Sequence, residues 1–138
     1  MELTEPHIIA LPKICDPRGN LTFAEGGVHL PFGIARVYWI YDVPAGETRG
    51  AHAHRVGQEL IIATGGSFNV NLFDGVDMRT FTLNRPYMGL YVPPGYWRTL
   101  DNFSSGSVCM VLSSTEYTED DYIRDYGEFI ETARRHGI

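Results

Sequence analysis

Residues 46–66 read GETRGAHAHRVGQELIIATGG, and they contain the most specific pattern of chemically active residues in the chain. It holds His52 and His54, separated by one residue, and then Glu59 after four more. Side chains alternate along a β-strand, so the two histidines point to the same face, with Cα atoms about 6.5–7 Å apart. Two neighbouring imidazoles can share a metal ion or a substrate. Glu59 opens an apolar run, residues 60–63, and can fold back beside the histidines.

The rest of the chain alternates short strand-like segments with turn residues. The expected strands include residues 34–41, 58–64, 67–73, 78–83 and 107–113. They are rich in β-branched and aromatic residues, and Asp74-Gly75 is a two-residue hairpin signal between two of them. Many short strands at regular spacing predict an all-β sandwich or barrel.

The periodicity changes near the C-terminus. Thr118 and Asp121 have the spacing of a capping box, and the apolar residues that follow fall on one helical face. Acidic residues come first and Arg134 and Arg135 come last, which suits the helix dipole. The pattern predicts a helical segment over about residues 118–136, which Gly127 can split into a short turn and a longer helix, within a single domain that spans residues 1–138.

The composition excludes several classes of partner. The net charge of −6 argues against nucleic acid and anionic membranes as general partners, and no segment has the apolar length of a membrane span. Residues 1–13, MELTEPHIIALPK, have neither the basic region nor the long apolar region of a signal peptide. Cys15 and Cys109 lie far apart and form no CxxC motif, so we expect two reduced thiols in a cytoplasmic protein.

The spacing of Gly46, His52, His54, Glu59 and Gly66 resembles the first sequence motif of the cupins, position for position. Cupins are small jelly-roll barrels that often hold a metal or a sugar nucleotide inside the barrel. The resemblance therefore implies an all-β cupin jelly-roll barrel, here with a short C-terminal helix.

Further segments narrow the resemblance. They are residues 16–21 (DPRGNL), 31–38 (PFGIARVY), 49–54 (RGAHAH), 102–105 (NFSS) and 122–126 (YIRDY). Together they resemble the WxcM-like sugar-nucleotide 3,4-ketoisomerases, over about residues 8–129. The resemblance implies a homodimer that converts dTDP-4-keto-6-deoxy-D-glucose to a dTDP-3-keto-6-deoxyhexose, for the biosynthesis of 3-amino-3,6-dideoxy sugars. It also implies that no metal or other cofactor is used, and that His52 and His54 are the catalytic centre.

One position departs from the metal-binding cupins. Their second motif reads P-x-G-x-x-H-x-x-x-N, whereas residues 93–102 read PPGYWRTLDN, with Arg98 in place of the histidine. A guanidinium group is always protonated and has no lone pair for a metal, and its charge repels a divalent ion. The sequence therefore predicts no metal site at His52, His54 and Glu59.

The expected reaction moves a ketone from C4 of a sugar to C3. A base removes the acidified C3 proton, donors stabilise the enediolate, and a proton returns to C4. Histidine suits both transfers, because its ordinary pKa of about 6.5 lets it act as a base and as an acid. Which of His52 and His54 acts on carbon stays open at this stage.

The remaining candidates are substrate contacts. Tyr38 and Arg49 are candidate donors to the enediolate, since negative charge develops on its oxygens. Arginine grips phosphate with two parallel hydrogen bonds, which makes Arg18, Arg49 and Arg98 candidates for the diphosphate. Gln58 and Glu59 complete this set of contacts, and Glu59 can instead orient a histidine.

Three other functions use the same residues. A sugar-nucleotide epimerase would remove the same kind of proton and return it to the opposite face of the same carbon. A metal-dependent cupin, either an oxygenase or a sensor, would use His52, His54 and Glu59 as ligands. A sugar-binding cupin without catalysis would leave its ligand unchanged.

Overall fold

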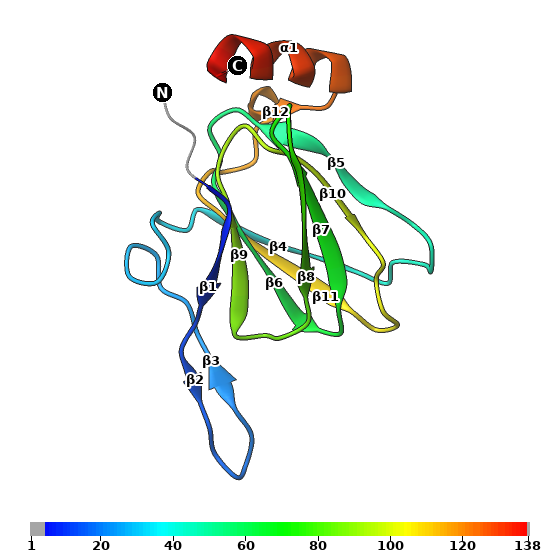
Figure 1. The fold of residues 1–138 in the computed structure, drawn as a ribbon. Helices are drawn as coiled ribbons and strands as arrows, with labels where there is room; N and C mark the ends of the chain where they lie inside the picture. The colour runs from blue at the N-terminus through cyan, green and yellow to red at the C-terminus, as the bar shows by residue number, and fades with distance from the viewer. Residues whose placement is uncertain (1–4, 138) are drawn as a thin grey trace.

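The computed structural model describes residues 5–137, which form two five-stranded antiparallel sheets and a separate hairpin (Figure 1). The first sheet has the order β1 (His7–Ala10), β9 (Met88–Val92), β6 (Glu59–Gly65), β11 (Val108–Ser113) and β4 (Arg36–Tyr41). The second has the order β12 (Tyr122–Ile123), β5 (Arg49–His54), β10 (Trp97–Asp101), β7 (Phe68–Phe73) and β8 (Met78–Leu83). From β4 to β12 each strand crosses to the other sheet, except at the β7–β8 hairpin, which confirms the predicted all-β jelly roll.

The main core lies between the two sheets. In β6, Ile61 and Ala63 face the second sheet and pack with Val70 and Leu72 of β7. The alternate residues of β6 face outward, where the N-terminal segment covers them with Leu11, Leu30 and Phe32. Both faces of β6 are therefore buried, which explains its continuous apolar run.

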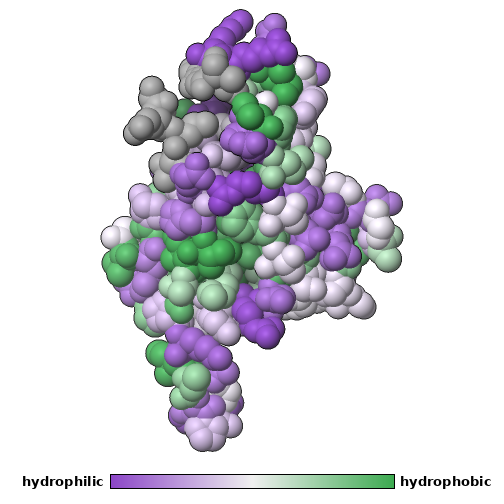
Figure 2. All heavy atoms as spheres, in the orientation of Figure 1, coloured by the Kyte–Doolittle hydropathy of each residue, from purple (hydrophilic) through white to green (hydrophobic). Residues whose placement is uncertain are grey.

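A hairpin formed by β2 (Lys13–Ile14) and β3 (Leu21–Thr22) projects from the barrel. Figure 1 shows it at the lower end, away from both sheets, and Figure 2 shows it standing clear of the body. Its turn is closed by a hydrogen bond from Gly19 N–H to the carbonyl of Asp16 at 2.9 Å. Gly19 has a φ of +132°, a conformation that favours glycine.

The C-terminal segment differs from the predicted helix over residues 118–136. A single 3₁₀ turn, η1 (Glu119–Asp121), leads into β12, and the α-helix α1 (Tyr126–Gly137) begins five residues after Asp121. The side chain of Thr118 makes no capping hydrogen bond, so the predicted capping box is wrong. Helix α1 lies across the end of the barrel where β12 pairs with β5, and Phe129 anchors it against Ala53 and Ile123 (Figure 1).

Residues 1–4 and 138 lie outside the described part of the chain. Both ends of the predicted domain therefore lie outside it. So do the first four of residues 1–13, in which the sequence shows no signal-peptide pattern. Among residues 5–137, the structure has no helix that is both long and apolar enough to span a membrane.

Candidate active site

Strands from both sheets supply the candidate site at the inner face of the barrel. His52 and His54 lie on β5, and Arg98 lies opposite His52 on the neighbouring strand β10. Glu59 on β6 and Tyr38 on β4 come from the other sheet. These residues, except His54, line a cavity of about 380 Å³.

A glycine shapes the strand just before the histidines. Gly50 has a φ of +94°, and a Cβ there would lie 3.1 Å from the carbonyl oxygen of Arg98 and 3.0 Å from Leu100 Cδ1. The pairing of β5 with β10 shifts register at this point, between Arg98 and Thr99. Only glycine combines this conformation with such a close approach, so Gly50 sets the bend that leads into His52.

Glu59 is the centre of the buried polar network. One carboxylate oxygen pairs with the Arg98 guanidinium, and the other accepts a hydrogen bond from the Tyr38 hydroxyl at 2.9 Å. Burial is the largest single effect and would raise the pKa of Glu59, but the charge of Arg98 together with the contacts to His54 and Tyr38 outweighs it and lowers that pKa to about 2. Glu59 is therefore a carboxylate, and burial together with its charge raises the pKa of Tyr38, which stays protonated.

His54 is fully buried behind the cavity wall. Its Nδ1 lies 2.8 Å from Oδ2 of Asp121, and its Nε2 lies 3.4 Å from Oε2 of Glu59. Asp121 is 67 residues further along the chain and is itself buried. Sequence reasoning assigned Asp121 to a helix cap and missed this contact. The only available signal was that the adjacent residues 122–126 belong to the family resemblance.

His52 is the histidine that faces the cavity. Its ring is 5.0 Å from that of His54, centre to centre, and nearly perpendicular to it. Burial, followed by the charges of Arg98 and His54, lowers the pKa of His52 to about 3. Its Nε2 is buried without a hydrogen-bond partner among the described residues. His52 is therefore a neutral imidazole with an unpaired nitrogen, which is the form that a general base needs.

Arginines surround the outer part of the same cavity. Arg49 was predicted, whereas Arg36 and Arg124 were not. The Arg36 guanidinium lies over the rings of Tyr38 and Tyr117, with centroid distances of 5.2 and 5.6 Å. Because Arg36 precedes Tyr38 by two residues on one strand, strand alternation was a usable signal for it. Although the whole protein is acidic, this cavity is lined by cations.

Two predicted substrate contacts lie elsewhere. Arg18 is at the turn of the β2–β3 hairpin, where its side chain is 90% exposed and pairs with Asp16 at 2.9 Å. Gln58 does not line the cavity, because its Oε1 accepts a hydrogen bond of 2.6 Å from the Tyr91 hydroxyl.

The residues present do not fit a divalent metal ion. No group of three or more His, Cys, Asp or Glu side chains within residues 5–137 is arranged to hold one. One oxygen of Glu59 is already paired with Arg98, and that guanidinium stands at the position of the third histidine.

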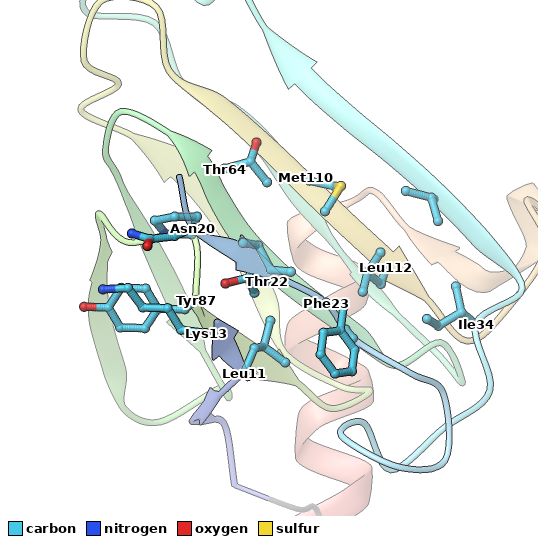
Figure 3. Close-up of a pocket in the computed structure, with 14 residues that line it drawn as sticks. Leu11, Lys13, Asn20, Thr22, Phe23, Ile34, Thr64, Tyr87, Met110 and Leu112 are labelled. Atoms are coloured by element: carbon cyan, nitrogen blue, oxygen red, sulfur yellow. The ribbon is translucent and has the colours of Figure 1, made fainter. Parts of the chain in front are cut away.

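A larger hollow, of about 690 Å³, lies on the outer face of the first sheet (Figure 3). Its lining is mostly apolar and combines Met110 and Leu112 of β11 with Lys13 and Thr22 of the hairpin. It is lined by no histidine and no carboxylate, so the acid–base chemistry belongs to the smaller cavity inside the barrel.

Fold and site together define a jelly-roll protein of the cupin class, with a neutral histidine inside the barrel and arginines around the opening. The chain belongs to the FdtA family, described as "WxcM-like, C-terminal", whose model matches residues 4–134.

Relatives of known activity cover nearly the whole chain. It is 43% identical to the TDP-4-oxo-6-deoxy-alpha-D-glucose-3,4-oxoisomerase of Aneurinibacillus thermoaerophilus, over 91% of this chain and 90% of that protein. A histidine-to-asparagine variant of the 3,4-ketoisomerase QdtA from Thermoanaerobacterium thermosaccharolyticum, in complex with TDP-4-keto-6-deoxyglucose, has a TM-score of 0.95. It is 36% identical, and the match covers 96% of each chain. The TDP-quinovose 3,4-ketoisomerase WlaRB from Campylobacter jejuni has a TM-score of 0.87 and 40% identity, covering 91% of this chain and 97% of that one.

Proposed function

We propose that this chain is a sugar-nucleotide 3,4-ketoisomerase that converts dTDP-4-keto-6-deoxy-D-glucose to a dTDP-3-keto-6-deoxyhexose. The observation that carries the proposal is the neutral His52, which has an unpaired Nε2 and lines the same cavity as the arginines. The relatives support it, because each acts on a TDP-linked sugar as an isomerase of this kind. The product would enter the biosynthesis of 3-amino-3,6-dideoxy sugars.

The arginines divide the cavity into an outer part, for the diphosphate, and a deeper part, for the sugar. Arg36, Arg49 and Arg124 are the candidates for the diphosphate, since they line the cavity without being buried as Arg98 is. The reacting sugar then lies deeper, beside His52 and Arg98. Arg98 has Nε and one Nη buried without partners among the described residues, so it can donate hydrogen bonds to a ligand there. This assignment moves Arg98 from the diphosphate to the sugar.

The proposed reaction needs no oxidant or reductant. His52 takes the proton from C3, and the electrons of that C–H bond form the C3–C4 double bond of an enediolate. Arg98, through its unpaired N–H groups, stabilises the negative oxygen, whereas the one O–H of Tyr38 is directed to Glu59. The protonated His52 then returns a proton to C4, and the hydroxyl proton moves from O3 to O4, which leaves the ketone at C3 and His52 neutral again. We assign the carbon base to His52 and a supporting role to His54, which does not line the cavity.

Proton NMR of the substrate in heavy water, with enzyme treated with EDTA, tests this function. Loss of the C3 proton signal and appearance of a 3-keto product with deuterium at C4 are expected. A 4-keto product with inverted C3 would instead identify an epimerase. An unchanged spectrum with stoichiometric metal in the untreated protein would indicate a metal-dependent cupin, and unchanged ligand without metal would indicate a binding protein.

We further propose that the protein is a homodimer in which the β2–β3 hairpin packs against a second copy. Ile14 and Leu21 of the hairpin are 54% and 55% exposed, and Trp39 and Tyr41 on the edge strand β4 are 58% and 60% exposed. The apolar hollow of Figure 3 lies between these two regions, since it is lined by the hairpin and by Val37 of β4. A second copy would cover this apolar surface.

Hairpin exchange would also give Arg18 a role, by bringing it to the partner's cavity. Sedimentation of the wild-type protein, of Trp39→Glu and of Leu21→Glu tests the dimer. Wild type is expected at twice the chain mass and both variants at the chain mass. A folded wild-type monomer would contradict the proposal and would also remove Arg18 from the site. The free thiols of Cys15 and Cys109 support a reducing, cytoplasmic location.

A further inference from the structure

The ring of His54 lies between two buried carboxylates. Asp121 forms a hydrogen bond of 2.8 Å with Nδ1, whereas Glu59 lies 3.4 Å from Nε2, close enough for an ion pair but without hydrogen-bond geometry. A neutral imidazole carries one N–H, so its other nitrogen would present a lone pair to a carboxylate oxygen. An imidazolium has two N–H groups and is attracted by both carboxylates.

Charge balance favours the imidazolium as well. The polar and titratable groups that face His54 from the packed elements are Asp121, Glu59, His52, Tyr122 and, through Glu59, Arg98. Two carboxylates and one guanidinium leave a single negative charge without a partner. A proton on His54 neutralises the buried cluster, and an unpaired buried charge is costly.

Asp121 is held in place independently of His54. Its Oδ1 accepts hydrogen bonds from the backbone N–H groups of Val56 at 2.7 Å and Gly57 at 3.3 Å. Gly57 leaves space for the Asp121 side chain, since a Cβ at this position would lie only 2.6 Å from Asp121 Oδ2. The loop after β5 and the turn η1 therefore fix the position of the Asp121 carboxylate.

We propose that Asp121 and Glu59 hold His54 as an imidazolium, and that Asp121 is a positioning residue which, through His54, keeps His52 in the neutral form of a base. The first part concerns the free protein alone. The second part rests on the proposed isomerase function. The charge of His54 is one of the causes that lower the pKa of His52, after burial and Arg98, which agrees with this division of roles.

Nitrogen NMR of the histidine-labelled protein at pH 7.5 tests the protonation directly, because a ring nitrogen with a proton and one without differ widely in chemical shift. His52→Asn and His54→Asn assign the signals. Two protonated nitrogens are expected for His54, and one protonated and one bare nitrogen for His52. A bare nitrogen on His54 in the wild-type protein would overturn the proposal, whether or not the protein turns over any substrate.

Asp121→Asn changes the charge and keeps the shape. Its amide oxygen can still accept from the loop, while its NH₂ group donates to Nδ1 of His54. The expected result is a neutral His54 with bare Nδ1 and protonated Nε2. Gly57→Ala displaces Asp121 without changing a charge and should alter the His54 signals too. Asp120→Asn, at an exposed neighbouring residue, should leave them unchanged. Wild-type His54 signals in folded Asp121→Asn would refute the role of Asp121.

The pH profile of kcat/KM separates positioning from simple structural support. With His54 neutral, His52 takes up a proton more readily, so the acid limb should move to higher pH in Asp121→Asn. We also expect kcat to fall while KM stays nearly unchanged, because Asp121 does not line the cavity and so does not contact the substrate. An acid limb at the wild-type pH would exclude the link from Asp121 to His52. If the wild-type protein has no isomerase activity, the proposed function fails while the NMR result still decides the state of His54.

Discussion

Glu59 and His54 come from strands in different sheets, yet Oε2 of Glu59 lies 3.4 Å from Nε2 of His54. Strands β5 and β6 are consecutive in the chain but do not pair, because the loop between them crosses from one sheet to the other. The polar network of the site therefore also joins the two halves of the barrel. Changes to it should alter stability as well as activity.

His52→Asn is expected to lower kcat by about 10²–10⁴-fold, because general acid–base catalysis by one group typically contributes that much. KM and the thermal midpoint should change little, since asparagine is similar in size and polar. Steady-state kinetics and circular dichroism measure both. A loss of only a few-fold would remove His52 as the carbon base.

Glu59→Gln should lower the free energy of unfolding by about 3–5 kcal/mol, because it leaves the buried Arg98 charge without its counter-ion. Glu119→Gln is the matched control, since Glu119 also pairs with an arginine, Arg124, but at the exposed surface. The control should show no measurable change. Denaturant titration monitored by fluorescence gives the free energy of unfolding of both variants. Equal losses of stability would contradict the prediction that burial makes the Glu59–Arg98 pair the more important one.

Arg98→His is expected to create a metal site. Arg98 lies opposite His52 in the strand register, and a histidine there would join His52, His54 and Glu59 as possible ligands. The substitution also removes the cation that repels a divalent ion. Calorimetric titration with zinc or nickel should show binding by this variant at one equivalent. A folded variant without affinity for either metal would refute the claim that residue 98 lies within reach of the other ligands.

Acidification should destabilise the protein through His52. Its pKa is about 3 in the folded protein and about 6.5 in the unfolded chain, so between these pH values the unfolded state binds more protons. The free energy of unfolding contributed by His52 therefore falls as the pH is lowered through this window. Glu59, with a folded pKa of about 2, acts in the same direction below about pH 4.5.

Thermal midpoints at pH 5 to 7 test this sign. The wild-type midpoint should fall more steeply with decreasing pH than that of His52→Asn, which lacks the titrating group. Glu59 is common to both proteins and largely outside this range. Parallel curves would mean that His52 titrates normally in the folded state.

Arg36→Ala should weaken the binding of dTDP about ten- to 150-fold, the equivalent of about 1.5–3 kcal/mol for a hydrogen bond to a charged group. Arg55→Ala is the control, because Arg55 is an exposed arginine that pairs with Glu128 outside the cavity. Titration calorimetry at fixed salt compares the two. Equal affinities for both variants would place the diphosphate elsewhere.

The amino-acid sequence determined the features that depend on local pattern. Strand alternation predicts that His52 and His54 share a face, and the turn signals predict the all-β fold. Residues 78–83 form the predicted strand without change at either end. The substitution at Arg98 was visible as well, because it falls inside a motif of fixed spacing.

Which of these residues come into contact depends on the tertiary structure. The two histidines are equivalent in sequence, but the barrel turns His52 to the cavity and buries His54 against Asp121. Gln58 and Arg18 lie near motifs in sequence, yet their side chains form other pairs. Local periodicity states which face a side chain takes on its own strand. It does not state which strand lies opposite, and in a barrel that crossing assembles the site.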